Sequence, residues 1–115
     1  MSTEVPIILD KTGLGSMKPI TIMEQFYDTA NKLSDRVAMH ATRYDKIIQW
    51  TWKEYLDDII SFAKAMHVVG ITERKSLNIM GHNAPEWPIA FLGSIFANCV
   101  STGVYVTNFD DACIY

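Results

Sequence analysis

One uncharged stretch limits what this chain can fold into, because no Asp, Glu, Lys or Arg occurs from Trp87 to Phe109. Its length approaches the roughly 20 apolar residues that a membrane-spanning helix needs. Polar residues and a proline interrupt it, however, and no basic residue follows it: Pro88, Ser94, Asn98, Ser101, Thr102, Thr107 and Asn108. We therefore expect a buried helix, a short turn over residues 98–101 and a buried strand, with a membrane span as the alternative.

Composition and charge exclude several classes of protein. The chain has 115 residues, of which 49% are hydrophobic and 20% charged, as in a single small globular domain and unlike a disordered tail. Ten Lys and Arg against thirteen Asp and Glu give a net charge of −3 without a basic run, so we expect no nucleic-acid partner. Two cysteines, Cys99 and Cys113, are too few for a disulfide scaffold. The N-terminal segment carries an acidic residue where a signal peptide has a basic region. We expect a cytoplasmic chain in a reducing compartment.

The first helix is predicted by a capping box. Residues 1–20, broken by glycines and prolines, are predicted to form an irregular lead-in. Thr21 follows, with Glu24 three residues later and apolar residues at helical spacing behind it. A hydroxyl and a carboxylate at this spacing satisfy each other's backbone amides, so a helix over 21–34 is predicted.

A second capping box and a glycine predict the next helix. Thr51 and Glu54 repeat the spacing at the start of residues 52–69, and Gly70 can end this helix in a left-handed conformation.

A β-hairpin is predicted between these two helices. Residues 37–43 and 46–51 are short and rich in β-favouring side chains, with Tyr44 and Asp45 between them. The pattern does not fix the register of the two strands.

Strand, helix and strand are predicted to follow one another in the last third of the chain. Apolar runs over 76–80 and 101–106 are typical of buried parallel strands. Between them, Asn83 is predicted to cap a helix over 84–98, whose first turn Pro88 is predicted to bend at the cost of a backbone bond. These elements make a right-handed βαβ unit. The fold class is α/β, a β-hairpin plus a βαβ unit with helices packed on a mostly parallel sheet.

The residues that could carry chemistry form no catalytic or metal-binding pattern. Gly13 and Gly15 lack the third glycine of a nucleotide-binding loop. Asp57 and Asp58 are adjacent and point about 100° apart on a helix, which predicts a solvated face. Cys99 is predicted to be a packed thiol at the end of an apolar helix, since no activating group lies near it. The histidines are too scattered for metal-ligand spacing: His40, His67 and His82.

Five short segments, in this order, resemble the opening of an adenylate-forming enzyme: residues 19–26, 51–55, 69–71, 81–87 and 103–108. Residues 81–87 resemble the family's Asn-x-Pro-Glu-Trp segment, and residues 103–108 resemble a Gly-x-Tyr-x-Thr-Asn segment. Together they are most similar to the bubblegum-type branch of the long-chain fatty acyl-CoA synthetases. The resemblance extends from about Gly13 to Tyr115.

The resemblance implies an enzyme that activates a long-chain fatty acid with ATP and Mg²⁺ and passes the acyl group from an acyl-adenylate to coenzyme A. The family's Ser/Thr/Gly-rich phosphate loop, ribose-binding aspartate and catalytic lysine lie further along, so no catalytic residue is carried over. We expect residues 21–115 to be the N-terminal part of an AMP-binding domain, truncated before the phosphate loop. ATP, Mg²⁺ and coenzyme A are then expected in the complete enzyme, and none is expected to bind this chain alone.

Two other functions stay open at this point. The chain could be a non-catalytic regulatory fragment that pairs with a full-length synthetase through an unfinished sheet edge. It could also belong to another adenylate-forming enzyme, of the luciferase-like or adenylation-domain type. The fatty acyl branch further implies peripheral association with the endoplasmic reticulum membrane.

The topology predicts where a pocket would lie. Ligands in open α/β sheets gather at the carboxyl ends of the strands. The residues at this level are predicted to border the pocket, while Trp87 is predicted to anchor the third helix on the sheet: Gly81, His82, Asn83, Thr107 and Asn108.

Overall fold

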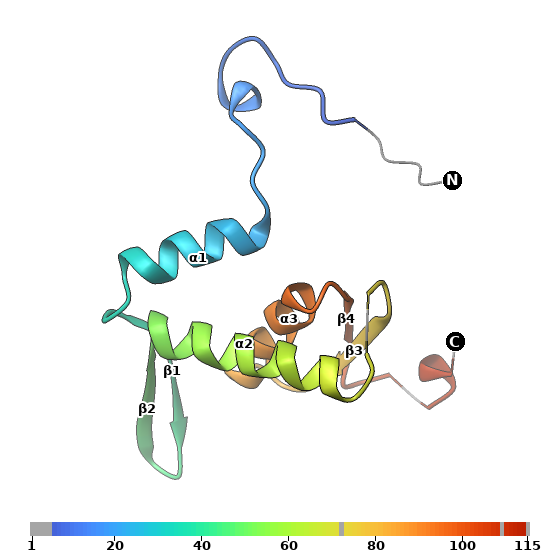
Figure 1. Ribbon diagram of the computed structural model, residues 1–115. Coiled ribbons are helices and arrows are strands. Elements are labelled where there is room, and N and C mark those ends of the chain that lie inside the picture. The colour runs from blue at the N-terminus through green and yellow to red at the C-terminus, as the bar shows by residue number, and fades with distance from the viewer. Residues whose placement is uncertain (1–5, 72, 109, 115) are drawn as a thin grey trace.

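Helices and short strands alternate along the chain in the predicted order (Figure 1). The computed structural model describes residues 6–71, 73–108 and 110–114. Its elements are α1 (Ile22–Lys32), β1 (Val37–Arg43), β2 (Lys46–Thr51), α2 (Trp52–Val68), β3 (Ser76–Met80), α3 (Glu86–Phe96) and β4 (Val100–Val104), with 3₁₀ turns at Leu14–Ser16 and Asp110–Cys113. The α/β fold class is confirmed.

The strands pair in two separate two-stranded sheets within the described residues. β1 and β2 form the predicted antiparallel hairpin, in register from Arg43 opposite Lys46. Its two turn residues, Tyr44 and Asp45, have φ of 49° and 60°, the positive values that a tight hairpin turn of two residues uses. β3 and β4 pair in parallel, from Ser76 opposite Val100, and α3 connects them.

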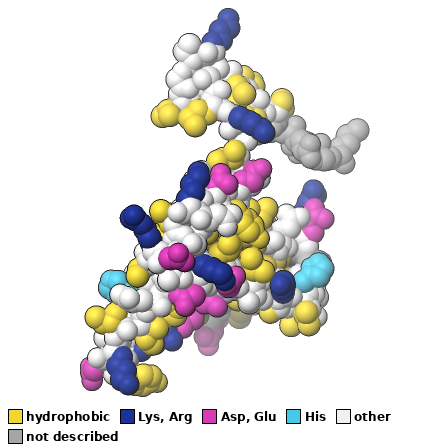
Figure 2. Space-filling view, turned by 60° about the vertical axis from the view of Figure 1, so that its left-hand side comes forward, with side chains coloured by type: hydrophobic (Ala, Val, Ile, Leu, Met, Phe, Trp, Pro, Cys, Tyr) yellow, Lys and Arg dark blue, Asp and Glu magenta, His cyan; other side chains and the backbone are white. Residues whose placement is uncertain are grey.

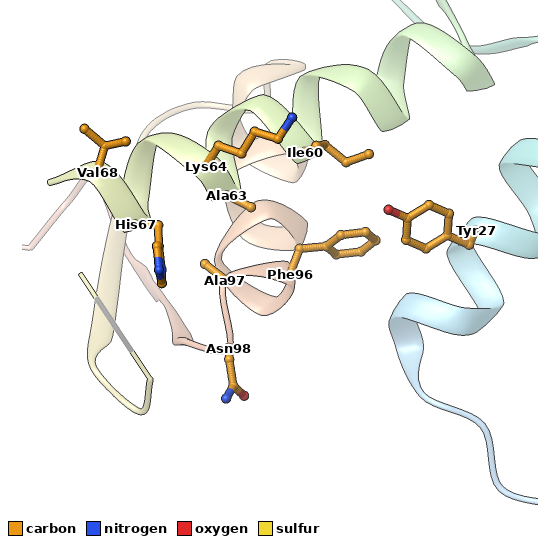
Figure 3. Close-up of a pocket in the computed structure, with 9 residues that line it drawn as sticks. All are labelled: Tyr27, Ile60, Ala63, Lys64, His67, Val68, Phe96, Ala97 and Asn98. Atoms are coloured by element: carbon orange, nitrogen blue, oxygen red, sulfur yellow. The ribbon is translucent and has the colours of Figure 1, made fainter. Parts of the chain in front are cut away.

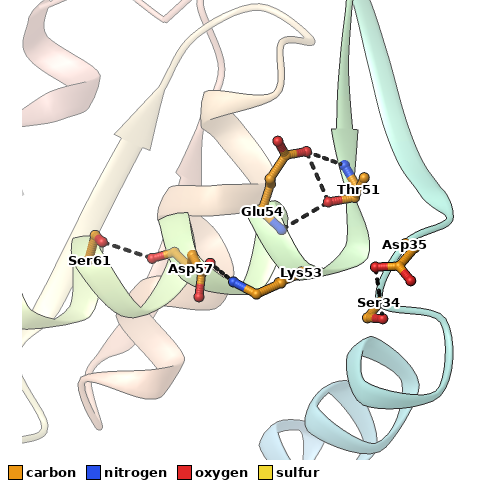
Figure 4. A network of polar contacts seen from close by, with 7 residues as sticks. All are labelled: Ser34, Asp35, Thr51, Lys53, Glu54, Asp57 and Ser61. Atoms are coloured by element: carbon orange, nitrogen blue, oxygen red, sulfur yellow. Dashed lines mark hydrogen bonds and ion pairs between the residues drawn. The ribbon is translucent and has the colours of Figure 1, made fainter.

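Both predicted capping boxes are present. At the start of α2 the Glu54 amide donates to Thr51 Oγ1 (3.2 Å), and the Thr51 amide donates to Glu54 Oε2 (2.8 Å) (Figure 4). Thr21 and Glu24 make the same pair of bonds at the start of α1. The backbone amides lower the pKa of both glutamates, because they bind the charged form.

We expect Thr51→Ala to lower the free energy of unfolding by about 0.5–2 kcal/mol, since it leaves the Glu54 amide without its side-chain acceptor. The loss should shrink in acid. The folded-state pKa of Glu54 lies below the unfolded value of about 4.3. The hydrogen bond from the Thr51 hydroxyl to this carboxylate, which the alanine variant lacks, therefore contributes above the unfolded pKa, and its contribution is lost as the pH falls through the folded pKa. Urea titrations of both proteins at pH 7 and pH 3 check this. Thr12→Ala, in the exposed lead-in, is the control, and an equal effect of both substitutions would contradict the prediction.

The predicted start of the third helix is wrong. Asn83 is not its cap: α3 begins at Glu86, and the N-cap is Pro85, whose φ of −54° and ψ of −30° are already helical. The Trp87 amide donates to the Ala84 carbonyl (3.0 Å), so a backbone turn prepares this end without a side-chain cap. Pro88 therefore lies in the first turn, where amides have no partner within the helix, and it costs no backbone bond.

Two helices end in the same backbone motif. Gly70 has the predicted left-handed conformation, with φ of 79°, and the amides of Gly70 and Ile71 donate to the carbonyls of His67 and Met66. This is a Schellman arrangement. Asn98 takes the equivalent place after α3, with φ of 61°.

The uncharged stretch from Trp87 is divided between α3 and β4, as predicted, but the turn between them spans residues 97–99 instead of the predicted 98–101, because β4 already begins at Val100. β4 ends at Val104 rather than at residue 106, because the Asn108 amide donates to the Tyr105 carbonyl (3.0 Å) and turns the chain. None of the helices in the described part of the chain has the length and apolar character needed to cross a membrane.

The core lies where α2 and α3 pack together. Ile59 and Ser94 are fully buried there, and Gly93 brings the two helices close to each other. An aromatic cluster attaches α1 to this pair, with Phe26 edge-on to Tyr55 (ring centroids 5.1 Å apart) and to Phe96 (6.2 Å). Residues 6–20 extend away from this body, with hydrophobic and lysine side chains in the open (Figure 2).

Candidate functional site

A hollow of about 360 Å³ opens at the carboxyl ends of β3 and β4. The topology rule predicts a site at this place. Its lining comes from the β3–α3 connection, the first turn of α3 and the end of β4: Gly81, Asn83, Trp87, Gly103, Val104, Tyr105 and Val106.

Trp87 forms one wall of this hollow. Its half-buried indole stacks on Phe91 (centroids 5.5 Å apart, planes 15° apart). A Cβ atom at Gly103 would lie 3.3 Å from Trp87 Cζ2, so the missing side chain makes room for the ring. A Cβ at Gly81 would meet only Trp87 Cδ1, at 4.0 Å, so a side chain would fit there.

The structure brings some of the predicted pocket residues together and not others. Gly81 and Asn83 line this hollow, and His82 lines a second hollow of about 280 Å³ that shares Gly81 and Trp87 with the first. Thr107 and Asn108 are exposed on the turn after β4 and are not among the residues lining either hollow. A role of these five residues in ligand binding stays a prediction.

A polar hollow lies on the neighbouring side of Asn83. It measures about 420 Å³ and includes His40 and Arg43 of β1 and Pro85 before α3. The Arg43 guanidinium pairs with the Glu86 carboxylate and lowers the pKa of Glu86 by hydrogen bonding to its charged form. This ion pair joins the hairpin to the start of α3.

The sequence did not predict this ion pair, nor that Tyr105 and Val106 line the hollow at the carboxyl ends of β3 and β4. Arg43 and Glu86 lie 43 residues apart, and no spacing rule connects such positions. Tyr105 and Val106 could have been found, because they lie within the Gly-x-Tyr-x-Thr-Asn segment that already pointed to this edge of the sheet.

Two other predictions about single residues are confirmed. Asp57 pairs with Lys53 (2.8 Å), whereas Asp58 accepts a hydrogen bond from Trp50 Nε1 (3.1 Å), so the two carboxylates face different partners on a solvated surface. Cys99 is a packed thiol, buried with its sulfur 3.6 Å from the Ala97 carbonyl oxygen.

The described residues around the hollows give no evidence of a site for ATP with Mg²⁺. No group of three His, Cys, Asp or Glu side chains within residues 6–71, 73–108 and 110–114 could hold a metal ion. Among the described residues that line the hollows around the β3–α3 connection, Arg43 is the one lysine or arginine, and it pairs with Glu86. We therefore derive no catalytic step through these groups.

Comparison with known proteins agrees with the resemblance of the short segments. Residues 26–115 match the AMP-binding enzyme family. The long-chain-fatty-acid–CoA ligase ACSBG2 of Gallus gallus is 34% identical over 112 residues, which are 97% of this chain and 15% of that protein. ACSBG1 of Homo sapiens is 32% identical over 97 residues, 84% of this chain and 13% of that protein. The chain thus spans about one seventh of the length of these relatives.

Solved structures share the fold. The N-terminal subdomain of Klebsiella oxytoca NpsA covers 80% of this chain with a TM-score of 0.68 at 17% identity, the match extending over 23% of that chain. A fatty acid AMP ligase from Legionella pneumophila covers 78% with a TM-score of 0.68 at 12% identity, over 16% of that chain. The α/β arrangement is that of the N-terminal subdomain of adenylate-forming enzymes. With most of its length matched by one family, the chain belongs to the AMP-binding enzymes.

Proposed function

We propose that this chain is the N-terminal scaffold of a long-chain fatty acid–CoA ligase. Such an enzyme converts a fatty acid, ATP and coenzyme A to acyl-CoA, AMP and pyrophosphate. The observation that carries the proposal is the 34% identity to a fatty acid–CoA ligase over 97% of the chain. The hollow at the carboxyl ends of β3 and β4 supports it, because residues 81–87 and 103–108 supply its lining.

The role of this chain in the reaction is structural. Gly103 and Trp87 shape one wall of the hollow, and the Arg43–Glu86 pair fixes the hairpin beside it. Adenylate formation needs preorganised donors around the developing phosphate charge. The described side chains include no such group of donors at the hollow, so we propose that the rest of a ligase supplies them.

The proposal predicts that the purified 115-residue chain forms no acyl-adenylate from ATP, Mg²⁺ and a long-chain fatty acid. The assay is ATP–pyrophosphate exchange, with intact Gallus gallus ACSBG2 as the positive control. Exchange above the no-protein blank that heating abolishes would contradict the prediction, since the chain would then contain a complete nucleotide site.

A chimera tests whether this chain can act as the N-terminal scaffold of a ligase. Residues 21–115 replace the matching segment of ACSBG2, and the chimera is expected to keep fatty acid–CoA ligase activity. The same chimera with Gly103→Val should lose activity while remaining folded, because a side chain at this position displaces the Trp87 indole. Thr102→Val, a substitution of similar size at the exposed neighbouring position of β4 outside the lining of the hollow, serves as the control and should keep activity. A folded chimera without activity would overturn the scaffold role.

Pairing with a full-length synthetase is a second candidate function. It is favoured by β3 and β4, since within the described residues each strand has only one hydrogen-bonded neighbour and therefore one open edge. Co-elution of this chain with intact ACSBG2 in size-exclusion chromatography would support this candidate.

A further inference from the structure

The described part of the lead-in, residues 6–20, carries a row of apolar side chains that the rest of the described structure leaves uncovered. Ile8, for example, is 89% exposed. Exposed apolar side chains that are close together in one segment are typical of a surface that binds a partner. The exposed apolar residues of this segment are Ile7, Ile8, Leu9, Leu14, Met17 and Ile20.

The lead-in has a defined turn in its middle. The Asp10 amide donates to the Gly15 carbonyl (3.0 Å), and the Ser16 hydroxyl donates to the Gly13 carbonyl (2.7 Å). Gly13 has φ of 76°, a value that glycine adopts without strain. Residues 10–16 therefore form a closed loop, and residues 6–9 continue from it as a stretched trace toward the N-terminus (Figure 1).

Residues 6–9 have the properties of a β-strand without a partner. Ile7 and Ile8 are β-branched, and none of the four residues is charged. Pro6 has no amide and suits the first position of a strand at a sheet edge. Within the described residues, no backbone hydrogen bond is made by Ile7, Ile8 or Leu9. These three residues can therefore bind a partner through their amides and carbonyls as well as through their side chains.

The groove of about 700 Å³ between α1, α2 and α3 is a poor acceptor for such a strand, in this chain or in a second copy of it (Figure 3). Ala63, Phe96 and Ala97 line it with apolar side chains. Most of its lining belongs to helices, whose backbone groups bond within each helix and leave no row of free amides and carbonyls.

A lipid bilayer is also a poor partner for this segment. An extended chain in hydrocarbon leaves its amides and carbonyls without hydrogen bonds, and each such group is costly there. Attraction to anionic lipid head groups needs a cluster of basic residues, whereas the segment has Lys11 and Lys18 against Asp10. The edge of a β-sheet satisfies the backbone groups and accepts apolar side chains.

The matched ranges indicate where this sheet edge lies. The match to Gallus gallus ACSBG2 includes the lead-in, because it extends over 112 of the 115 residues. The match to the AMP-binding enzyme family, in contrast, begins at residue 26. The lead-in thus has a counterpart in a ligase of which the match covers 15%, and the remaining chain of that ligase can supply a strand.

We propose that residues 6–9 add as a short β-strand to the edge of a sheet in the remainder of the ligase. The inference rests on the proposed function, since it takes this chain to be one segment of that enzyme. Amides and carbonyls of the added strand bond to the edge strand, and successive side chains lie on opposite faces of the sheet. Ile7 and Leu9 then share one face, and Ile8 lies on the other.

The test compares hydrogen–deuterium exchange of residues 7–9 in the intact 115-residue chain and in a chimera in which the whole chain replaces the matching segment of ACSBG2. In the isolated chain these amides should exchange as fast as those of an unstructured peptide. In the chimera the amides that face the edge strand should exchange at least about 100-fold more slowly, because strand hydrogen bonds open only with the sheet that holds them. The peptide of intact ACSBG2 that matches residues 6–9 should show the same protection.

Proline variants of the chimera identify strand pairing. Only alternate amides of an added strand bond to its partner, so either Ile8→Pro or Leu9→Pro should abolish the protection and the other should keep it. Leu14→Ala, at an exposed position outside residues 6–9, is the control and should leave the protection unchanged. Loss of protection in both proline variants, or in neither, would contradict strand addition. Should a proline chimera fail to fold, the exchange of the unmodified chimera and of intact ACSBG2 decides the same point.

Three other results would each overturn the proposal. Equal exchange in the isolated chain and in the chimera would show that the ligase supplies no strand edge. Protection that increases with the concentration of the isolated chain would place the segment on an open edge of β3 or β4 in a second copy. Protection that requires phosphatidylcholine–phosphatidylserine vesicles would show lipid binding. The chimera of residues 21–115 keeps the lead-in of ACSBG2 itself, so its activity reports on the proposed function alone.

Discussion

Replacing Gly93 with valine is expected to lower the free energy of unfolding by about 2–3 kcal/mol, because the side chain has no space between α2 and α3. A Cβ atom at this position would lie 2.6 Å from Phe62 Cδ1 and 3.1 Å from the Ile59 carbonyl oxygen. The second contact is with backbone, so moving one side chain cannot relieve it. Two further methyl groups would then force the helices apart.

Helix propensity opposes this loss and is too small to cancel it. Glycine in a helix interior costs up to about 1 kcal/mol relative to alanine, and valine recovers only part of that. Overpacking at a backbone contact costs more, so the net effect is destabilising. Urea unfolding measures the free energy of unfolding of the variant and of the unmodified chain. Gly81→Val is the matched control, because a Cβ atom at Gly81 would lie no closer than 4.0 Å to another residue. Equal unfolding free energies of the two variants would contradict the close approach of α2 and α3.

Local signals predicted the elements whose ends are set by neighbouring residues. The hairpin strands have the predicted bounds, since Tyr44 and Asp45 alone form the turn between them. Both capping boxes were predictable because a side chain and an amide three residues away satisfy each other whatever the rest of the chain does. Gly70 ends α2 for a similarly local reason, its access to positive φ.

The ends that sequence reasoning misplaced depend on backbone bonds that residue type does not indicate. Asn83 has the right side chain for a cap, but Ala84 and Pro85 turn the chain first, so α3 begins at Glu86. At the end of β4, the turn closed by Asn108 removes two residues from the predicted strand.

The candidate site was predictable only as a region. The parallel topology indicated the edge of the sheet, and Gly81 and Asn83 do line a hollow there. The groove beside Phe96 gave no signal in sequence, because its shape depends on how α1 docks through contacts such as Phe26 with Tyr55. Such contacts join residues far apart in the chain, and spacing rules describe only near neighbours.

The core makes a prediction of larger effect. Ile59→Ala should lower the free energy of unfolding by roughly 2–5 kcal/mol, through lost burial and the cavity that the missing carbons leave. Ile59 has no exposed surface, and it lies on the same α2–α3 contact as Gly93. A small domain has only about 5–15 kcal/mol of stability in total. The variant should therefore lose a large share of the total, and its urea midpoint should fall well below that of the unmodified chain.

A series of three isoleucine substitutions separates the loss of core packing from other effects of shortening the side chain. Ile59→Val removes one methylene and should cost about 0.5–1.5 kcal/mol, clearly less than alanine. Ile47→Ala removes the same atoms as Ile59→Ala from a hairpin position that is 68% exposed, and it should change stability by no more than about 0.5 kcal/mol. If the α2–α3 contact is the core, urea unfolding should give the largest loss of unfolding free energy for Ile59→Ala, a smaller loss for Ile59→Val and the smallest loss for Ile47→Ala. Similar losses for Ile47→Ala and Ile59→Ala would mean that the hairpin and the helix pair stabilise the fold equally, and the position of the core would be wrong.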